Sequence, residues 1–140
     1  MITEELRRKR AQIVRRHMEV ENTGDAEALL ATFHRPRYDL VSASAIREGA
    51  DQVRQHVLDL RAALPGCLVE GVAFHYADDA VIVETRTRGP HTGGWNGIPA
   101  SGRPIDIRGI AMFVFDADKL MEERVYYDRQ TLRDQITPTP

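Results

Sequence analysis

The spacing of apolar residues changes once along this chain, at Pro65-Gly66, and this change limits the folds that it can adopt. Before this point apolar residues recur at intervals of three and four, which is typical of amphipathic helices. After it they alternate with polar residues, which is typical of strands with one buried face. Helices followed by a run of strands predict an α+β fold, with a mostly antiparallel sheet and the helices on one face.

The same spacings predict where each element lies. Gly24 suits the end of a first helix, and Asp25 suits the N-cap of a second. We expect three helices, at residues 3–21, 26–33 and 50–64. We expect a first strand at residues 38–43, after Pro36, and then a four-strand meander at 67–77, 80–89, 105–115 and 120–128.

Length and composition bound the function. At 140 residues the chain predicts one domain, here residues 1–136, followed by a disordered tail at 137–140. The formal net charge of −2 argues against a general nucleic-acid binder. No apolar run is long enough for a membrane span, and the charged N-terminus does not suit a signal peptide. We therefore expect a cytoplasmic protein with neither nucleic acid nor membrane as partner.

Two local features favour a structural interpretation. Cys67, the one cysteine, opens an apolar run and is more simply explained as a packed residue than as a nucleophile. The basic residues between Arg7 and Arg16 are interleaved with glutamates, which favours a solvated helix face over a phosphate-binding or membrane-binding surface.

The strand expected at residues 80–89 leads to a candidate pocket. Side chains alternate across a strand, so its uncharged positions, which end with Gly89 and then His91, share the core face. Glu84, Arg86 and Arg88 then lie on the other face. A Gly/Pro-rich loop follows and contains Trp95, the one tryptophan. A histidine and a large aromatic residue beside a flexible loop predict a small-molecule site.

Three segments give the chain a wider resemblance: ENTGDAEALLATF, HTGGWNGIPASGR and DADKLMEERVYYDRQTLRDQ. With the order of elements, they resemble the SnoaL-like polyketide cyclases and the wider nuclear transport factor 2-like superfamily, over nearly the whole chain. The resemblance implies a curved, mostly antiparallel sheet wrapped by three helices into a cone. It also implies an apolar ligand inside the cone and a homodimer.

The resemblance does not carry over the catalytic groups of these relatives. The acid/base aspartate of the polyketide cyclases falls at Val125, and a histidine of the preceding strand falls at Ala111. In relatives that resemble limonene-epoxide hydrolases, the arginine and aspartate of an earlier strand fall near Thr85 and Thr87. Asp128 matches a recurrent family aspartate that is more readily explained as a structural cap.

The candidates that remain for acid/base chemistry are His91, Glu123, Tyr127 and Tyr38. A histidine titrates near neutral pH, and an apolar cone would raise the pKa of a carboxyl group toward the same range. A His91/Glu123 pair could therefore run an enolisation, a cyclisation or an epoxide opening without a metal or organic cofactor. The residues expected to line the substrate site are Trp95, Thr85, Thr87, Val125, Ala111, Phe113 and Asp128.

Each candidate has a structural alternative. His91 could simply bond loop backbone, and Glu123 could belong to a rim ion pair. The other four histidines, His17, His34, His56 and His75, lack metal-ligand spacing and are interpreted as structural.

Two main functions stay open at this stage. One is an acid/base enzyme of the cyclase, isomerase or epoxide-opening type, and the other is a non-catalytic small-molecule-binding domain. A third, a pure interaction module, predicts a cone filled by side chains.

Overall fold

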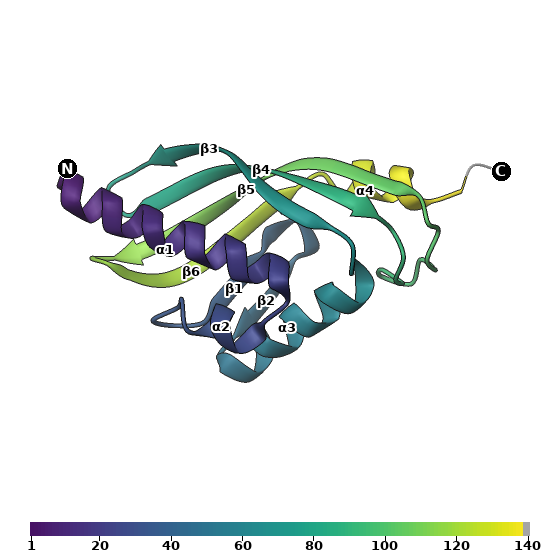
Figure 1. Ribbon diagram of the computed structural model, residues 1–140, viewed down its shortest axis with the longest axis horizontal. Helices are drawn as coiled ribbons and strands as arrows, with labels where there is room; N and C mark the ends of the chain where they lie inside the picture. The colour runs from purple at the N-terminus through teal and green to yellow at the C-terminus, as the bar shows by residue number, and fades with distance from the viewer. Residues whose placement is uncertain (139–140) are drawn as a thin grey trace.

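The computed structural model describes residues 1–138 and places four helices against a curled six-stranded sheet (Figure 1). Residues 139–140, the end of the expected tail, lie outside the described residues. The helices are α1 (Glu4–Thr23), α2 (Ala26–Leu30), α3 (Ala50–Ala63) and α4 (Arg129–Ile136). The strands are β1 (Arg37–Leu40), β2 (Ala45–Glu48), β3 (Leu68–Tyr76), β4 (Ala80–Pro90), β5 (Pro104–Asp116) and β6 (Lys119–Tyr127). A 3₁₀ turn, Val41–Ala43, joins β1 to β2.

The α+β class and the mostly antiparallel sheet are confirmed. The strand order is β2-β1-β6-β5-β4-β3, and the one parallel pair joins β1 to β6. Three elements were not expected: the strand β2, the helix α4 and the 3₁₀ turn at Val41–Ala43, which replaces the last three residues of the expected first strand. β2 has only four residues, too few to show alternation, and α4 carries only Leu132 and Ile136 as buried positions. The fourth helix extends the three-helix cone that the resemblance implies.

The register of the sheet aligns inward-facing residues in rows that cross the strands. One row runs Val81, Phe113, Glu123 and Tyr38, because each is the Cα partner of the next. The adjacent row is Val83, Ala111, Val125 and Leu40. Val81 and Val83 are fully buried whereas Arg88 is exposed, which confirms the face assignment for this strand.

Helix α1 covers the inner face of the sheet. Thr3 accepts a hydrogen bond from the Leu6 backbone N–H at its start, and Gly24 ends it in the left-handed conformation. Its buried side includes Val14, His17 and Met18. The main apolar core packs between this side, α2, α3 and the strands β1 and β4 to β6.

The expectation of a fully solvated basic face on α1 was wrong for Arg10. This residue is 3% exposed, and its guanidinium donates to the backbone oxygens of Ala117 and Asp78 at 2.8 Å each. It also lies over the ring of Phe115. Arg10 therefore ties α1 to the turns at one end of the sheet.

A second apolar cluster closes the opposite end, where α4 and the loop at 91–103 meet α3 and β5 (Figure 1). Its buried members are Leu64, Cys67, Ile105, Leu132 and Ile136. Cys67 is thus a packed residue, as expected, and burial raises the pKa of its thiol. Within residues 1–138, no helix is long and apolar enough to cross a membrane.

Two substitutions on β5 test which of its side chains face the core. Phe113 is fully buried and Ile110 is 40% exposed on the other face. Phe113→Ala is expected to lower the free energy of unfolding by about 3–5 kcal/mol, because it leaves a cavity in the core. Ile110→Ala should cost less than about 1 kcal/mol. Urea unfolding of both variants measures this, and equal losses would contradict the facing of the strand.

Candidate active site

His17 is the centre of a buried polar cluster on the inner face. Its ring is fully buried, and Nε2 lies 2.8 Å from Glu123 Oε1, 3.1 Å from the Tyr38 hydroxyl and 3.6 Å from Glu21 Oε2. Glu21 follows His17 by one helical turn, so both side chains leave α1 on the same side. Glu123 and Tyr38 come from the first inward-facing row of the sheet. The cluster therefore joins α1 to β1 and β6.

A chain of hydrogen bonds sets the tautomer of His17. The Thr32 hydroxyl donates to the backbone oxygen of Leu29 at 2.6 Å and lies 2.7 Å from His17 Nδ1. Because its proton is engaged, this hydroxyl accepts from Nδ1–H. Nε2 then holds a lone pair, to which the Tyr38 O–H can donate.

Burial shifts the protonation of the acidic groups. Desolvation raises the pKa of Glu123 from 4.5 to about 8. The pKa of Glu21 is also raised to about 8, by desolvation first and by the charge of Glu123 second. Desolvation lowers the pKa of His17 to about 4. Near pH 7 the cluster is consequently a neutral histidine beside two carboxyl groups that both favour their protonated forms.

Aromatic side chains produce this desolvation. The rings of Phe33 and Phe113 pack edge-on against His17, with centroids 5.1 and 5.2 Å away. Glu123, which lies against His17 Nε2, is only 3% exposed. Its Oε1 has no aligned hydrogen-bond partner among the described residues, despite its closeness to Nε2. The carboxyl group is therefore held in an apolar setting with one oxygen unsatisfied.

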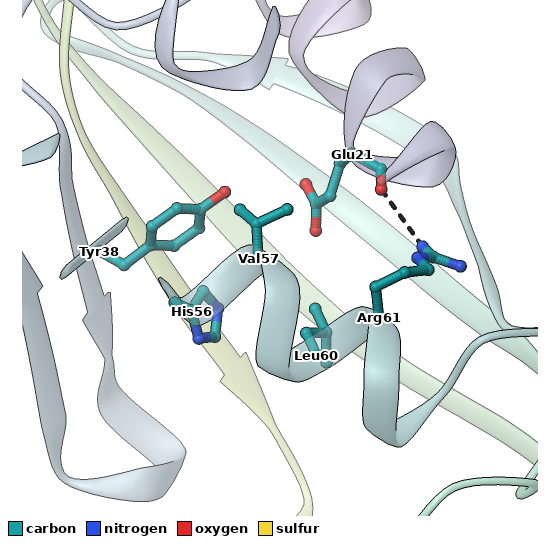
Figure 2. A pocket seen from close by; sticks show the side chains of 6 residues that line it. All are labelled: Glu21, Tyr38, His56, Val57, Leu60 and Arg61. Atoms are coloured by element: carbon teal, nitrogen blue, oxygen red, sulfur yellow. Dashed lines mark hydrogen bonds between the residues drawn. The ribbon is translucent and has the colours of Figure 1, made fainter. Parts of the chain in front are cut away.

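A small cavity adjoins the cluster between α1 and α3 (Figure 2). Its volume is about 10 Å³, room for about one water molecule. Its lining comprises Glu21, Tyr38, His56, Val57, Leu60 and Arg61. Burial lowers the pKa of His56 to about 4, so this ring is also neutral near pH 7.

Three ligand-type atoms of the cluster are close enough to hold a metal ion. One atom each from His17, Glu21 and Glu123 lie within 4.8 Å of one another, and they form the one such group among residues 1–138. The same three side chains can instead exchange protons without an ion, because two of them titrate near neutral pH.

Comparison with known sequences identifies the fold family. The sequence pattern of the SnoaL-like polyketide cyclases matches residues 11–136. The chain belongs to the SnoaL-like polyketide cyclase family. No curated protein matches it.

Solved structures agree with this SnoaL-like assignment. A protein from Jannaschia sp. CCS1, assigned to the SnoaL-like polyketide cyclases, is 21% identical with a TM-score of 0.88, over 100% of this chain and 99% of that one. A protein from Xanthomonas campestris pv. campestris, assigned to the polyketide cyclases, is 20% identical with a TM-score of 0.80, over 94% and 99%. A ketosteroid isomerase-like protein from Catenulispora acidiphila DSM 44928, solved with trimethylamine, is 18% identical with a TM-score of 0.77, over 91% and 97%.

The two positions that the SnoaL-like resemblance assigns to catalytic groups, Val125 and Ala111, are neighbours in the sheet. The two residues are Cα partners in the second inward-facing row, next to the row of Glu123. Both side chains are apolar, so this row supplies no acid or base. The titratable groups of this chain lie one row away from it and extend onto α1.

The structure brings some of the sequence candidates together and separates others. Glu123, Tyr38 and Phe113 all contact or adjoin His17. His91 does not join them. Val81 is the β4 residue in the row of Glu123, and His91 lies ten residues further along the chain, a path of roughly 33 Å from Val81. The expected His91/Glu123 pair is therefore wrong as a geometric pair.

His91 instead holds its own loop. It is fully buried, as the alternation predicted, and Nδ1 accepts from the Ser101 backbone N–H at 3.2 Å and lies 2.8 Å from the Ser101 hydroxyl. Its backbone also pairs with Gly102 and Arg103. These contacts match the structural alternative for this residue.

The remaining expected site residues lie toward the α4 end. Thr85, Gly109 and the half-buried Tyr127 form one row across β4, β5 and β6. Thr87 belongs to the next row toward α4. Trp95 packs on the second apolar cluster, with the Arg129 guanidinium 5.9 Å from its ring. Asp128 is the N-cap of α4 and accepts from the backbone N–H groups of Gln130 and Thr131.

The interpretation of His17 and His56 as structural missed the cluster. One signal was available for His17: it occupies the apolar stripe of α1, with Glu21 four residues later on the same side. A buried histidine and a carboxyl group one turn apart are a reason to look for a third partner on a strand. No sequence signal connects His56 or Thr32 to this site, because both come near it only through packing.

The protonation of the cluster predicts how stability depends on pH. The raised pKa of Glu123 means that the folded protein holds a proton that the unfolded chain releases between about pH 4.5 and 8. This stabilising contribution is complete below pH 4.5 and is lost as the pH rises through about 8. His17 and His56 act in the opposite direction only below their ordinary pKa of 6.5.

Glu123→Gln should therefore gain stability over the native protein as the pH rises from about 6.5 to 8, by up to about 1.4 kcal/mol per pH unit. Urea unfolding across this window measures the change. Glu19→Gln, on the exposed side of α1, serves as the control and should show no such trend. Parallel stability curves for the native protein and Glu123→Gln would contradict the buried, protonated state.

Proposed function

We propose that this chain is an acid/base enzyme that needs no cofactor and acts on a small apolar or polyketide-like molecule. The reaction would be of the cyclase, isomerase or epoxide-opening type. The observation that carries the proposal is the buried cluster of His17, Glu123, Tyr38 and Glu21, whose carboxyl groups have pKa values near 8. Strongly shifted titratable groups in an apolar site are a mark of proton-transfer chemistry.

Each member has a role in the proposal. Glu123 gives a proton to the substrate or takes one from it, because its raised pKa keeps both forms accessible near neutral pH. The Tyr38 hydroxyl turns its proton from His17 Nε2 to the substrate oxygen on which negative charge develops, and so stabilises that oxygen. His17, held through Nδ1 by Thr32, keeps Glu123 and Tyr38 in place around Nε2. Glu21 is the second carboxyl group and accepts or returns the other proton.

Substrate entry requires the cone to open. The cavity of about 10 Å³ is too small for a polyketide-like molecule, and the second apolar cluster fills the rest of the α4 end. The loop at 91–103, with Trp95, is the part of this end that lacks helix or strand hydrogen bonds over most of its length. We propose that it moves to admit the substrate past Thr85, Thr87 and Tyr127.

The kinetic test uses a panel of small ketones, epoxides and polyketide-like compounds. Glu123→Gln should lower kcat/KM on the compound that the native protein converts by on the order of a hundredfold or more, and Tyr38→Phe by about tenfold or more. Glu122→Gln removes a neighbouring carboxylate that pairs with Arg37 and should change turnover less than about twofold. Full activity in Glu123→Gln would reject Glu123 as the acid/base.

A non-catalytic binding domain is the second candidate. One observation favours it: Val125 and Ala111 are apolar at the positions that the resemblance assigns to the family's functional groups. The nearly filled interior is instead what an interaction module predicts. If the chain is such a binding domain, the native protein should bind a compound of the kinetic panel saturably and convert none of them.

We also propose a homodimer that forms through the outer face of β4 to β6. Ile110 and Tyr126 are neighbours on this face and are 40% and 38% exposed, which is unusual for large side chains in the middle of a sheet. Light scattering at micromolar concentration should give twice the 15.8 kDa chain mass. A monomeric mass would contradict the proposal, and Ile110→Asp should convert a dimer to monomers.

A further inference from the structure

Several hydrogen-bond acceptors line the cavity beside the cluster. The Tyr38 hydroxyl can direct its proton to His17 Nε2, at 3.1 Å, and then presents only lone pairs to other neighbours. Glu21 contributes a carboxyl group, for which no hydrogen bond is made by its side chain within the described residues. His56, as a neutral imidazole, offers a lone pair on one ring nitrogen. The lone pairs of these three groups can accept hydrogen bonds from a donor-rich ligand.

The nearest cation is only partly engaged. Arg61 also lines the cavity, and its Nη2 donates to the backbone oxygen of Glu21 (Figure 2). Its Nη1 donates to the backbone oxygens of Pro65 and Cys67, which leaves the Nε–H without a hydrogen-bond partner among the described residues. Glu21 and Glu123 both favour their protonated forms near pH 7, with pKa values of about 8. An ammonium group beside Glu21 would favour the ionised form of this carboxyl group, so that binding would release a proton and form a buried ion pair.

We propose that this cavity binds the protonated amino group of a ligand, so that the substrate of the site is a small apolar molecule with a primary ammonium end. This inference deepens the proposed function and rests on it only in assigning the ligand as substrate. The ammonium nitrogen would donate to the Glu21 carboxylate, the Tyr38 oxygen and His56 or Glu123.

The dimensions of the cavity fit this occupant. A volume of about 10 Å³ suits a group about the size of one water molecule, which an –NH₃⁺ group is. Three N–H donors match the acceptors of Glu21, Tyr38 and His56. Val57 and Leu60 complete the lining and suit the first carbons of the attached chain. The Tyr38 and His56 rings, with centroids 5.0 Å apart, add electron-rich surface next to the charge.

The test measures binding without turnover. Methylammonium chloride is titrated into the ¹⁵N-labelled protein at constant ionic strength with sodium chloride, to about 200 mM. Saturable shifts of the Glu21, Tyr38 and His56 resonances are expected, with a dissociation constant on the order of 10 mM for so small a ligand. Tetramethylammonium has the same charge but no N–H donor and a larger volume, and it should cause no saturable shift.

Matched variants separate the site from general charge effects. Glu21→Gln and Glu123→Gln should weaken methylammonium binding at least about tenfold, and Tyr38→Phe about threefold or more. Glu19→Gln, an exposed carboxylate on the same helix, should leave it unchanged. If a glutamate variant fails to fold, methylammonium binding by Tyr38→Phe still tests the site.

Several outcomes would overturn the inference. One is that methylammonium causes no saturable resonance shifts in the native protein. Another is that methylammonium and tetramethylammonium cause equal shifts, and a third is that Glu21→Gln binds methylammonium as well as the native protein does. Zinc or manganese binding that the glutamate variants abolish, without any methylammonium binding, would assign the cluster to a metal ion instead. A failed kinetic test of Glu123 leaves a positive binding result standing, and an absence of methylammonium binding leaves the acid/base proposal standing with a neutral substrate.

Discussion

The close approach of His17, Glu21 and Glu123 on the inner face of the sheet is the constraint on which the rest of the interior depends. Arg61 lies beside Glu21 and gives its Nη groups to backbone oxygens. Removing a carboxylate from water is expensive, so Glu21 and Glu123 hold protons at pH values where exposed glutamates do not. Phe33 and Phe113 keep water away from His17. Thr32 and Tyr38 satisfy both nitrogens of its ring.

The register of the sheet brings the side chains of this cluster together. Glu123 belongs to a run of three charged residues, and alternation turns it inward while Glu122 pairs with Arg37. The parallel pairing of β1 with β6 then sets Tyr38 beside Glu123, although 85 positions separate the two in sequence. Helix α1 completes the site with His17 and Glu21. A shift of one residue in the register of β6 would place Glu122 or Arg124 inside instead.

The positions that the SnoaL-like resemblance assigns to catalytic groups and the buried titratable groups of this chain lie in neighbouring rows of the sheet. Val125 and Ala111 make the usual position apolar, and the titratable groups lie in the row of Phe113 and Glu123. In this chain the acidic groups therefore lie beside the expected row, and His17 and Glu21 of α1 adjoin Glu123. The second apolar cluster, with Trp95 and α4, closes the other end of the cone.

The sequence by itself determined the class of fold, the long strands and the inward face of β4, because these depend on periodicities of a few residues. It also named Glu123 and Tyr38 among the inward-facing candidates, and both side chains are buried. Only the tertiary structure decided which candidates meet. His91 and Glu123 share an inward face, but alternation says nothing about position along a strand, and the register places them far apart. His17 entered the site because α1 packs across the sheet at that row, a long-range contact that no local pattern encodes.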